Sequence, residues 1–488
     1  MMMSWPDARY TATPVAEYTG NPFIECLPPI MSDEHFIKSM TVYPAFQAEE
    51  RELPKEVRRH LIKRLDTFRV PTVEIVAAHQ KLDVELRHGY VDRDPKLVAA
   101  RRSMYGQLEV TRRERAATPN CQLITGLSGG GKSTLLESIL AVYPQVVMHH
   151  DITPGISREP QLVWLKVDCP QDAGLRGLCM AILEHIDELL GTSYLYEWGH
   201  SRCSVEGFLQ AIYRITNNLH LGVLVLDELQ HLRSAKAGGQ EKMLNFFVNL
   251  INGVGLPLVF AGTYALEGIV TQQLRNARRA TGVGTVTLPR LRLNDPMWRL
   301  FTRTLWRYQW ITKPAPLDSV MEETFYDCTQ GIRDCGVRLF AAAQNRAIDD
   351  GSECITVTTL RETYDKAFKP LHEAHQLLRS GRPDDDPIFD SLLSKNENQP
   401  HGWRATADGI TAPSISAPAT SNARMGRPID PKKCDRESTF PILDARQEMQ
   451  PFDLRRVEGD VYEAIASEGL IDKGVATILP LPKRRQHG

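Results

Sequence analysis

The sequence lacks the features that mark secreted, zinc-binding and membrane-spanning proteins. Its nine cysteines are scattered and form no Cys-x-x-Cys pair, which argues against a zinc site and against a disulfide framework. No run of about 18 apolar residues occurs, so a membrane span is not expected. The first residues contain no basic stretch followed by an apolar run, so a signal peptide is not expected either. We therefore expect a cytoplasmic protein without a membrane partner.

An excess of charge of one sign is also missing. The 58 Lys and Arg residues nearly balance the 60 Asp and Glu residues, and the net charge is −2. This balance gives no global sign of a nucleic-acid partner, although a local basic surface remains compatible with it. No internal repeat is present, and a length of 488 residues suggests about three folded units.

Changes in composition and periodicity divide the sequence into five parts. Helical patterns rich in Arg and Lys come first, and they fit either the solvated faces of helices or a surface that contacts a partner. A stretch poor in large apolar residues follows the last strong helical pattern, and we expect it to be disordered. The parts are an N-terminal helical extension (1–115), an α/β core (116–294), a small helical domain (295–378), a disordered linker (379–455) and a C-terminal segment with a short helical pattern (456–488).

The second part alternates short apolar runs with longer helical patterns. The runs cover 122–125, 162–167, 222–226, 256–262 and 285–288, and the helical patterns cover 132–143, 175–190, 205–217 and 242–251. This alternation predicts an α/β fold with a parallel five-stranded sheet covered by helices on both faces. The third part has helical patterns only, over 297–308, 317–328, 337–348 and 358–378. Aromatic side chains interleave with arginines in the first of these helices, and we expect them to pack in the core rather than to stack on bases.

Residues 126–133 match the P-loop pattern G-x-x-x-x-G-K-[ST], between a predicted strand and a predicted helix. Its glycines let backbone N–H groups point at phosphate oxygens, and the start of the helix adds the positive end of its dipole. Lys132 would reach the β- and γ-phosphates, and Ser133 would ligate Mg²⁺. The predicted ATP-binding residues are Gly126, Leu127, Ser128, Gly129, Gly130, Gly131, Lys132, Ser133 and Thr134.

Asp227 and Glu228 directly follow a buried apolar run. Carboxylates at the end of a buried strand are costly unless they serve a cation or a water molecule. Asp227 would hold the metal through its water shell, and Glu228 would orient and deprotonate the attacking water. The two elements together predict Mg²⁺-dependent hydrolysis of ATP.

The P-loop, the Asp-Glu pair and the α/β pattern resemble the AAA+ ATPases, which gives further positions an interpretation. Thr263, at the end of the next strand, would lie beside the attacking water, although a strand-end threonine in a turn is an alternative. Arg333 opens a helix and loosely resembles the sensor-2 arginine, with one residue fewer in the spacing. Arg278 or Arg279 would be the arginine finger that completes the site of a neighbouring subunit. For these arginines, an ordinary surface position is the alternative.

Several segments together resemble the TnsC/TniB family of transposon-encoded AAA+ ATPases, over about residues 21–378. They are Asn-Pro-Phe-Ile-Glu (21–25), Leu-Pro-Pro-Ile (27–30), the P-loop, Leu-Lys-Val-Asp-Cys-Pro (165–170), Asp-Glu-Leu-Gln-His-Leu (227–232) and Ala-Arg-Arg-Ala-Thr-Gly-Val-Gly (277–284). The chain is similar to the longer, TnsC-like members, because its tail exceeds that of the shorter TniB proteins.

The resemblance implies a regulator rather than a motor. Its members assemble on double-stranded DNA as ATP-bound homo-oligomeric rings or filaments, receive a signal from a target-selector protein and recruit transposase subunits. Hydrolysis then resets the assembly. By position and helical pattern alone, residues 456–475 would engage the transposase.

Two alternatives remain at this stage. An origin-type replication initiator or a helicase loader would share every nucleotide-binding residue, but no C-terminal helix-turn-helix domain is recognisable. A signalling scaffold would bind ATP only as a structural ligand. Glu228 argues against the scaffold, because a pure binder does not need a carboxylate that activates water.

Overall fold

The computed structural model describes residues 5–96, 121–153, 156–170, 174–199, 205–230, 239–267, 284–386, 388–389 and 392. All of these residues belong to one compact unit. Most of the expected linker (379–455), the C-terminal segment (456–488) and the two candidate finger arginines, Arg278 and Arg279, lie outside the described residues. Within the described part, no helix is long and apolar enough to cross a membrane.

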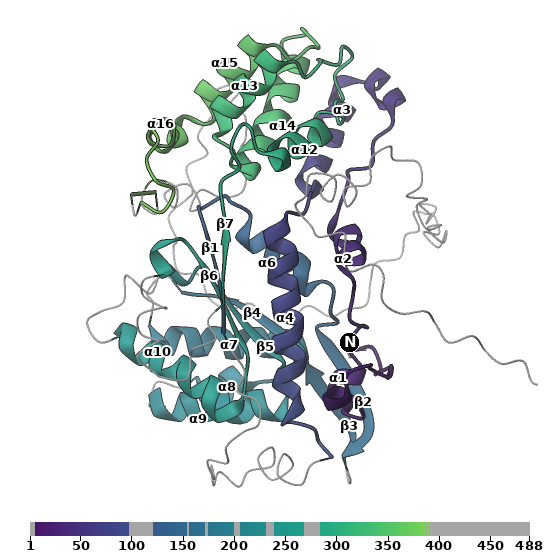
Figure 1. Ribbon diagram of the computed structural model, residues 1–488, viewed down its shortest axis with the longest axis vertical. Helices are drawn as coiled ribbons and strands as arrows, with labels where there is room; N and C mark the ends of the chain where they lie inside the picture. Colours follow the sequence, from purple (N-terminus) through teal and green to yellow (C-terminus); the bar gives the residue numbers. More distant parts are fainter. Residues whose placement is uncertain are drawn as a thin grey trace, which may run out of the picture. The chain divides into compact units, whose positions relative to one another are not determined.

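A parallel five-stranded sheet forms the centre of the α/β part, as the sequence predicts (Figure 1). Its strands lie in the order β4-β5-β6-β1-β7, and every neighbouring pair is parallel. The strands are β1 (Cys121–Gly126), β4 (Trp164–Asp168), β5 (Val223–Asp227), β6 (Leu258–Gly262) and β7 (Gly284–Leu288). They differ from the predicted runs by one or two residues at their ends.

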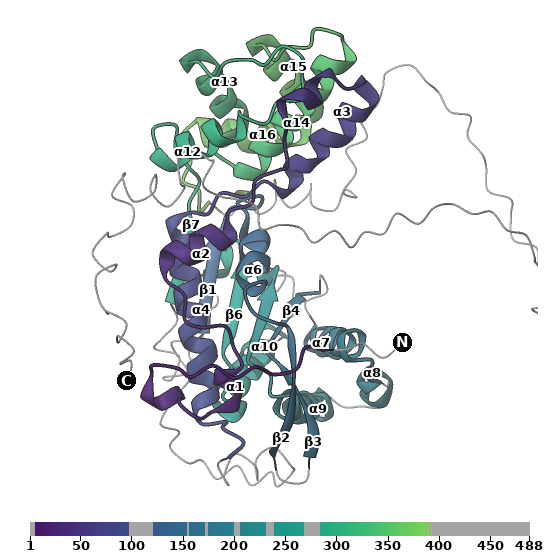
Figure 2. The ribbon, with the colours of Figure 1, turned by 90° about the vertical axis from the view of Figure 1, so that its right-hand side faces the viewer.

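Alternate residues of each strand enter different cores on the two faces of the sheet. Leu123 and Leu224 pack in one core, whereas their neighbours Ile124 and Val225 pack in the other. Helices α7 (Leu175–Leu190), α9 (Val205–Asn218) and α10 (Gly239–Asn249) cover the first face. Helices α4 (Val73–Val91) and α6 (Lys132–Leu140) cover the second (Figure 2). Helix α8 (Tyr194–Trp198) and the π-helical turn Leu250–Val254 complete the first layer.

An antiparallel hairpin of β2 (Val146–Thr153) and β3 (Ile156–Leu162) lies outside the main sheet and was not predicted. Both strands contain many polar residues, so their apolar periodicity is weak. The N-terminal segment extends the hairpin through a bridge between Asp7 and Met148. The backbone of Met148 exchanges hydrogen bonds with Pro6 and Ala8.

The third part contains helices only, as predicted. They are α12 (Pro296–Leu305), α13 (Ser319–Thr329), α14 (Arg333–Asp349), α15 (Val357–Ala367) and α16 (His372–Arg379). The prediction of one helix over 358–378 is wrong, because the 3₁₀ turn Lys369–Leu371 separates α15 from α16. Pro370 in this turn cannot continue an α-helix. The aromatic side chains of α12, Trp298 and Phe301, are buried in the core, as expected.

The N-terminal segment contacts both the sheet layer and the helical domain. Its elements are the 3₁₀ turn η1 (Ala16–Tyr18), α1 (Pro22–Glu25), α2 (Asp33–Met40), the 3₁₀ turn η2 (Ala48–Glu52), α3 (Lys55–Ile62), the 3₁₀ turn η3 (Lys63–Thr67) and α4. Helix α4 packs against β7 and β1, whereas α3 lies beside α14 in both views (Figures 1 and 2). Residues 48–67 thus form one short α-helix, α3, between the 3₁₀ turns η2 and η3.

Candidate nucleotide-binding site

The predicted site residues follow the carboxyl ends of neighbouring parallel strands. β1 ends at Gly126, β5 at Asp227 and β6 at Gly262. Because β6 lies between β1 and β5, its end separates the P-loop from the Asp-Glu pair. Thr125 is in register with Gly262, and Asp168 is in register with Asp227. Ligands of open α/β sheets bind at this edge.

The P-loop backbone adopts conformations that require its glycines. Gly129 and Gly131 have φ angles of +73° and +91°, in the left-handed region that L side chains rarely adopt. Gly130 is restricted for a different reason, because a Cβ there would lie 2.9 Å from the carbonyl oxygen of Leu127. Helix α6 begins immediately afterwards, at Lys132. The loop therefore leads directly into a helix N-terminus, which favours an anion.

Lys132 is buried and lies against the loop. Its ammonium donates hydrogen bonds to the carbonyl oxygens of Gly126 and Leu127, at 3.1 and 2.9 Å. Ser133 is half-buried on the first turn of α6, and Thr134 beside it is exposed. The arrangement holds a positive charge at the base of the loop, where phosphate groups would lie.

Asp227 is 1% exposed and ends β5. Its Oδ1 accepts a hydrogen bond from the backbone N–H of Glu228 at 2.9 Å, whereas Oδ2 accepts none from a described residue. Glu228 itself has a φ angle of +54°. A non-glycine residue in this region stores strain, and such residues cluster at functional sites.

Gln230 links Glu228 to Thr263, a connection that the sequence reasoning missed. Its amide Nε2 donates to a carboxylate oxygen of Glu228, and its Oε1 accepts a hydrogen bond of 3.3 Å from the backbone N–H of Thr263. Thr263 is buried, and its hydroxyl has no hydrogen-bond partner among the described residues. The motif at 227–232 includes Gln230, two residues after the predicted base, so the sequence could have indicated that Gln230 belongs to the site.

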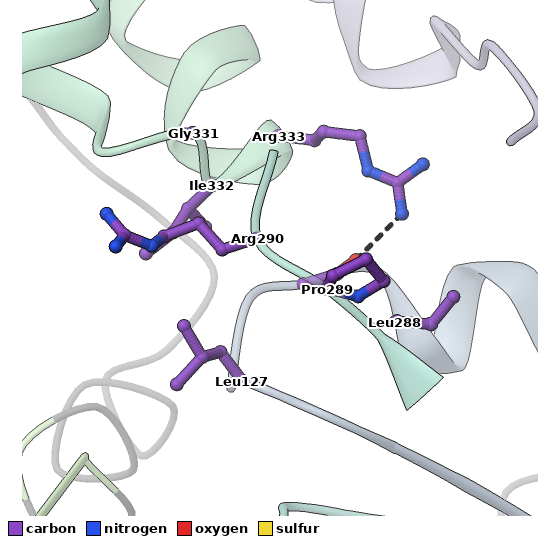
Figure 3. Close-up of a pocket in the computed structure, with 8 residues that line it drawn as sticks. Leu127, Leu288, Pro289, Arg290, Gly331, Ile332 and Arg333 are labelled. Atoms are coloured by element: carbon purple, nitrogen blue, oxygen red, sulfur yellow. Dashed lines mark hydrogen bonds between the residues drawn. The ribbon is translucent and has the colours of Figure 1, made fainter. Parts of the chain in front are cut away.

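Arg333 connects the helical domain to the P-loop. Its guanidinium donates a hydrogen bond of 3.0 Å to the carbonyl oxygen of Gly130 (Figure 3). A Cβ at Gly131 would lie 3.4 Å from the same guanidinium. Burial lowers the pKa of the Arg333 guanidinium. The structure thus brings Arg333, predicted from a loose motif, to the phosphate-binding loop.

A hollow lies between the P-loop, the end of β7 and the start of α14. Its cavity volume is about 10 Å³, about the space of one water molecule. The lining combines apolar and basic side chains of the α/β core and the helical domain, which are Leu127, Gly130, Leu288, Pro289, Arg290, Gly331, Ile332 and Arg333 (Figure 3). The hollow is therefore too small to be a formed pocket for a nucleoside, although it lies beside the P-loop.

The donor set fits the implied Mg²⁺ ion. Mg²⁺ prefers oxygen ligands and is usually held by one or two protein groups together with substrate phosphates. Ser133 supplies a hydroxyl oxygen at the start of α6, and Asp227 supplies a buried carboxylate oxygen without a hydrogen-bond partner among the described residues. These two residues would hold the ion.

Comparisons with known proteins agree with the fold. Residues 114–270 match the family model of an AAA domain, and this span includes the P-loop, Asp227, Glu228 and Thr263. No curated protein matches the chain.

Solved structures that match the chain include three proteins of low sequence identity. The Walker-type ATPase PABY2304 of Pyrococcus abyssi is 16% identical, with a TM-score of 0.35, 53% of this chain covered and 71% of that chain. The ORC1 protein of Aeropyrum pernix, solved in complex with DNA, is 15% identical, with a TM-score of 0.36 and coverages of 60% and 67%. Cdc6p of Pyrobaculum aerophilum is 11% identical, with a TM-score of 0.37 and coverages of 74% and 84%. The five-stranded parallel sheet with its P-loop, together with the AAA-domain match, identifies the fold as an AAA+ P-loop fold.

Proposed function

We propose that this protein binds ATP with Mg²⁺ and hydrolyses it. The observation that carries the proposal is the buried carboxylate of Asp227, which lies at the sheet edge that also holds the P-loop and has an oxygen without a hydrogen-bond partner among the described residues. Such a group is costly to bury without positive charge beside it; the Lys166 ammonium lies 3.4 Å from this oxygen, and Mg²⁺ bound to the phosphates of ATP would add to that charge.

Each residue of the site would have a separate role in binding and hydrolysing ATP. Ser133 and Asp227 would hold Mg²⁺, which neutralises charge on the phosphate oxygens. Lys132 would leave the carbonyl oxygens of the loop for the β- and γ-phosphates. Glu228 would take the proton of the attacking water, and the Thr263 hydroxyl would lie beside that water.

Two groups of residues would complete the nucleotide site. Arg333 would stabilise charge on the γ-phosphate from the helical domain, which would act as a lid. The adenine ring would lie near the hollow beside Leu127 and Ile332 only if the helical domain moved, because the volume of the hollow is about 10 Å³. Arg278 or Arg279 would enter the site of a neighbouring subunit, so that hydrolysis is completed at an interface between copies.

We further propose that this ATPase is a regulator of DNA transposition. The resemblance to TnsC/TniB proteins supports this role, with double-stranded DNA, transposase subunits and a target-selector protein as partners and a ring or filament as the assembly. Exposed arginines also support it. Arg299, Arg303 and Arg307 lie one turn apart on and just after α12 and form no ion pair with a described residue. Unpaired arginines in a row suit contacts with phosphates.

The test is the ATPase rate per subunit as a function of protein concentration, with and without long duplex DNA. We expect the rate to rise with concentration and with DNA, and to fall by about 10³-fold when both arginines are replaced (Arg278→Ala/Arg279→Ala). Glu228→Gln should abolish turnover and keep ATP binding. DNA binding should weaken as salt increases, because phosphate contacts release counterions.

Two outcomes of the ATPase experiment would contradict different parts of the proposal. An ATPase rate per subunit that does not change with protein concentration, with DNA or in the arginine variant would indicate a self-contained monomeric ATPase. It would exclude the transposition role. ATP binding without turnover under any assembly condition would favour a scaffold that uses ATP as a structural ligand.

A further inference from the structure

The ammonium group of Lys166 lies among three carboxylates beside the P-loop. Its Nζ is 3.4 Å from Oδ2 of Asp227, 3.4 Å from Oε1 of Glu137 and 3.6 Å from Oδ1 of Asp168. The Lys166 side chain is only 18% exposed, and Asp227 is the most buried of the three acids. Sequence reasoning gave Lys166 no role.

The fold brings these four groups together from three elements. Lys166 and Asp168 belong to β4, and the residues between and before them, Val167 and Leu165, pack in the core on the opposite face. Alternation therefore turns Lys166 toward α6, which carries Glu137 and begins at the P-loop lysine. Asp227 ends the adjacent strand, in register with Asp168.

The contact between the Lys166 ammonium and Asp227 joins opposite charges at 3.4 Å. Oδ2 of Asp227 lies 3.4 Å from the ammonium, yet no described residue donates a hydrogen bond to it. Burial opposes the charge on Lys166, but the carboxylates of Asp227, Asp168 and Glu137 outweigh this effect and raise its pKa. The ammonium therefore places a positive charge 3.4 Å from Oδ2 of the proposed metal-binding carboxylate.

The charges explain what Lys166 does at a metal site. Without Lys166, a divalent ion that approached Asp227 would meet the negative charges of Asp227, Asp168 and Glu137 and no positive charge from Lys166, and unit charges a few ångströms apart interact strongly at protein dielectric constants. With Lys166 present, the net charge of the cluster is smaller by one unit. Mg²⁺ then needs the additional negative charge of nucleotide phosphates to bind.

We propose that the Lys166 ammonium is the counter-charge of Asp227, which holds this carboxylate in place before the nucleotide arrives and lowers the affinity of Asp227 for divalent cations in the absence of nucleotide. Lys166 is thus a positioning residue that makes metal binding depend on ATP. This inference rests on the proposed nucleotide site.

The test measures Mn²⁺ binding to the full chain without nucleotide, by electron paramagnetic resonance of the free ion. Wild type should bind Mn²⁺ weakly. Lys166→Gln and Lys166→Met should bind it about tenfold more tightly or better, because a positive charge next to the ligands is lost. Lys166→Arg keeps the charge and should behave as wild type. Lys38→Met, on the surface of α2, is the matched control for the loss of one lysine charge.

Two outcomes would overturn the proposal. Mn²⁺ affinity that is the same in wild type and in both neutral variants would mean that Lys166 does not exclude the metal. Equal tightening in Lys166→Arg and the neutral variants would mean that charge is not the cause.

Folding is measured in parallel, by thermal unfolding with and without Mn²⁺. A neutral variant that folds only when Mn²⁺ is added would support the proposal, because the ion then replaces the ammonium. A variant that stays unfolded with Mn²⁺ would overturn it and leave Lys166 a structural ion pair.

Binding of a fluorescent ATP analogue to wild type is measured separately. Its absence would contradict the proposed function, whereas the Mn²⁺ comparison addresses Lys166 alone.

Discussion

Glu228 is held in an unfavourable backbone conformation by its neighbours. Its φ angle of +54° costs about 1 kcal/mol or more for a residue with a Cβ. The Asp227 carboxylate fixes its N–H, and Gln230 donates to its carboxylate. The predicted catalytic base is therefore fixed at both its backbone and its side chain, which is the kind of preorganisation that a site for water activation requires.

A comparison of two substitutions at this position isolates the backbone strain. Glu228→Gly and Glu228→Ala both remove the carboxylate, so both should abolish ATP hydrolysis. Glycine tolerates a positive φ, and alanine does not. We expect the glycine variant to have the higher free energy of unfolding, by about 1 kcal/mol, in urea denaturation monitored by circular dichroism. An alanine variant as stable as the glycine variant would show that the strain is absent in solution.

At the scale of elements, the N-terminal segment is attached to two parts of the molecule. Arg58 on α3 forms two hydrogen bonds of 2.7 Å with the carboxylate of Glu353 and one of 2.9 Å with the carbonyl oxygen of Trp310, both in the helical domain. On α4, the Tyr90 hydroxyl donates a hydrogen bond to the carbonyl oxygen of His220, which precedes β5. The N-terminal segment therefore links the helical domain to the α/β core through hydrogen bonds.

Breaking the contact between α3 and the helical domain tests this attachment. Arg58 is 4% exposed, and its loss removes the positive charge beside Glu353, which keeps the hydrogen bond of 3.1 Å from the Thr312 N–H. We expect Arg58→Met to destabilise the protein by about 3 kcal/mol and to expose the segment to protease. The double variant Arg58→Met/Glu353→Gln removes both charges and should recover part of this loss. Equal protease resistance in wild type and the single variant would refute the attachment.

The same pair has a defined pH dependence. The hydrogen bonds from Arg58 hold the pKa of Glu353 below its usual value. The contact therefore contributes its full stability above the ordinary carboxyl pKa of about 4.5, and that contribution is lost as the pH falls through the lowered value.

Local patterns predicted most elements, but not their long-range contacts. The strands and the helices α7 and α9 follow from apolar periodicity, which depends on neighbouring residues only. The β2–β3 hairpin has a weaker period and was missed. Arg58 and Glu353 are 295 positions apart, and no local pattern indicates that they meet. Lys166 was missed for the same reason, since Glu137 and Asp227 reach it from other elements.

For the molecule as a whole, several histidines lie in the interior and are favoured in their neutral form. His149 and His375 are fully buried, and His220 is nearly so. Burial lowers the pKa of His149 to about 4 and that of His375 to about 3, and it also lowers the pKa of His220. His149 pairs with the Tyr10 hydroxyl at 2.9 Å and with Gln161 Oε1 at 2.8 Å, and it thereby links the N-terminal segment to the hairpin.

These lowered pKa values predict that acidification destabilises the whole molecule. In the unfolded chain a histidine takes up a proton near pH 6.5, whereas folded His149 stays neutral until about pH 4. The unfolded state therefore binds more protons between these values. The stability that the neutral ring contributes is complete above about pH 6.5 and is lost as the pH falls toward 4.

The comparison of wild type with His149→Gln measures this contribution. Between pH 7.5 and 5.5, we expect wild type to lose about 1 kcal/mol more unfolding free energy than the variant, because the variant lacks one of the protons taken up on unfolding. The interval lies above the titration range of most carboxylates, so their contribution is small. His185→Gln, on the exposed side of α7, is the matched control and should follow wild type. If the free energy of unfolding changed with pH by the same amount in wild type and His149→Gln, the buried ring would not couple folding to pH. The network of Tyr10, His149 and Gln161 would then be a neutral packing contact rather than a site of acid sensitivity.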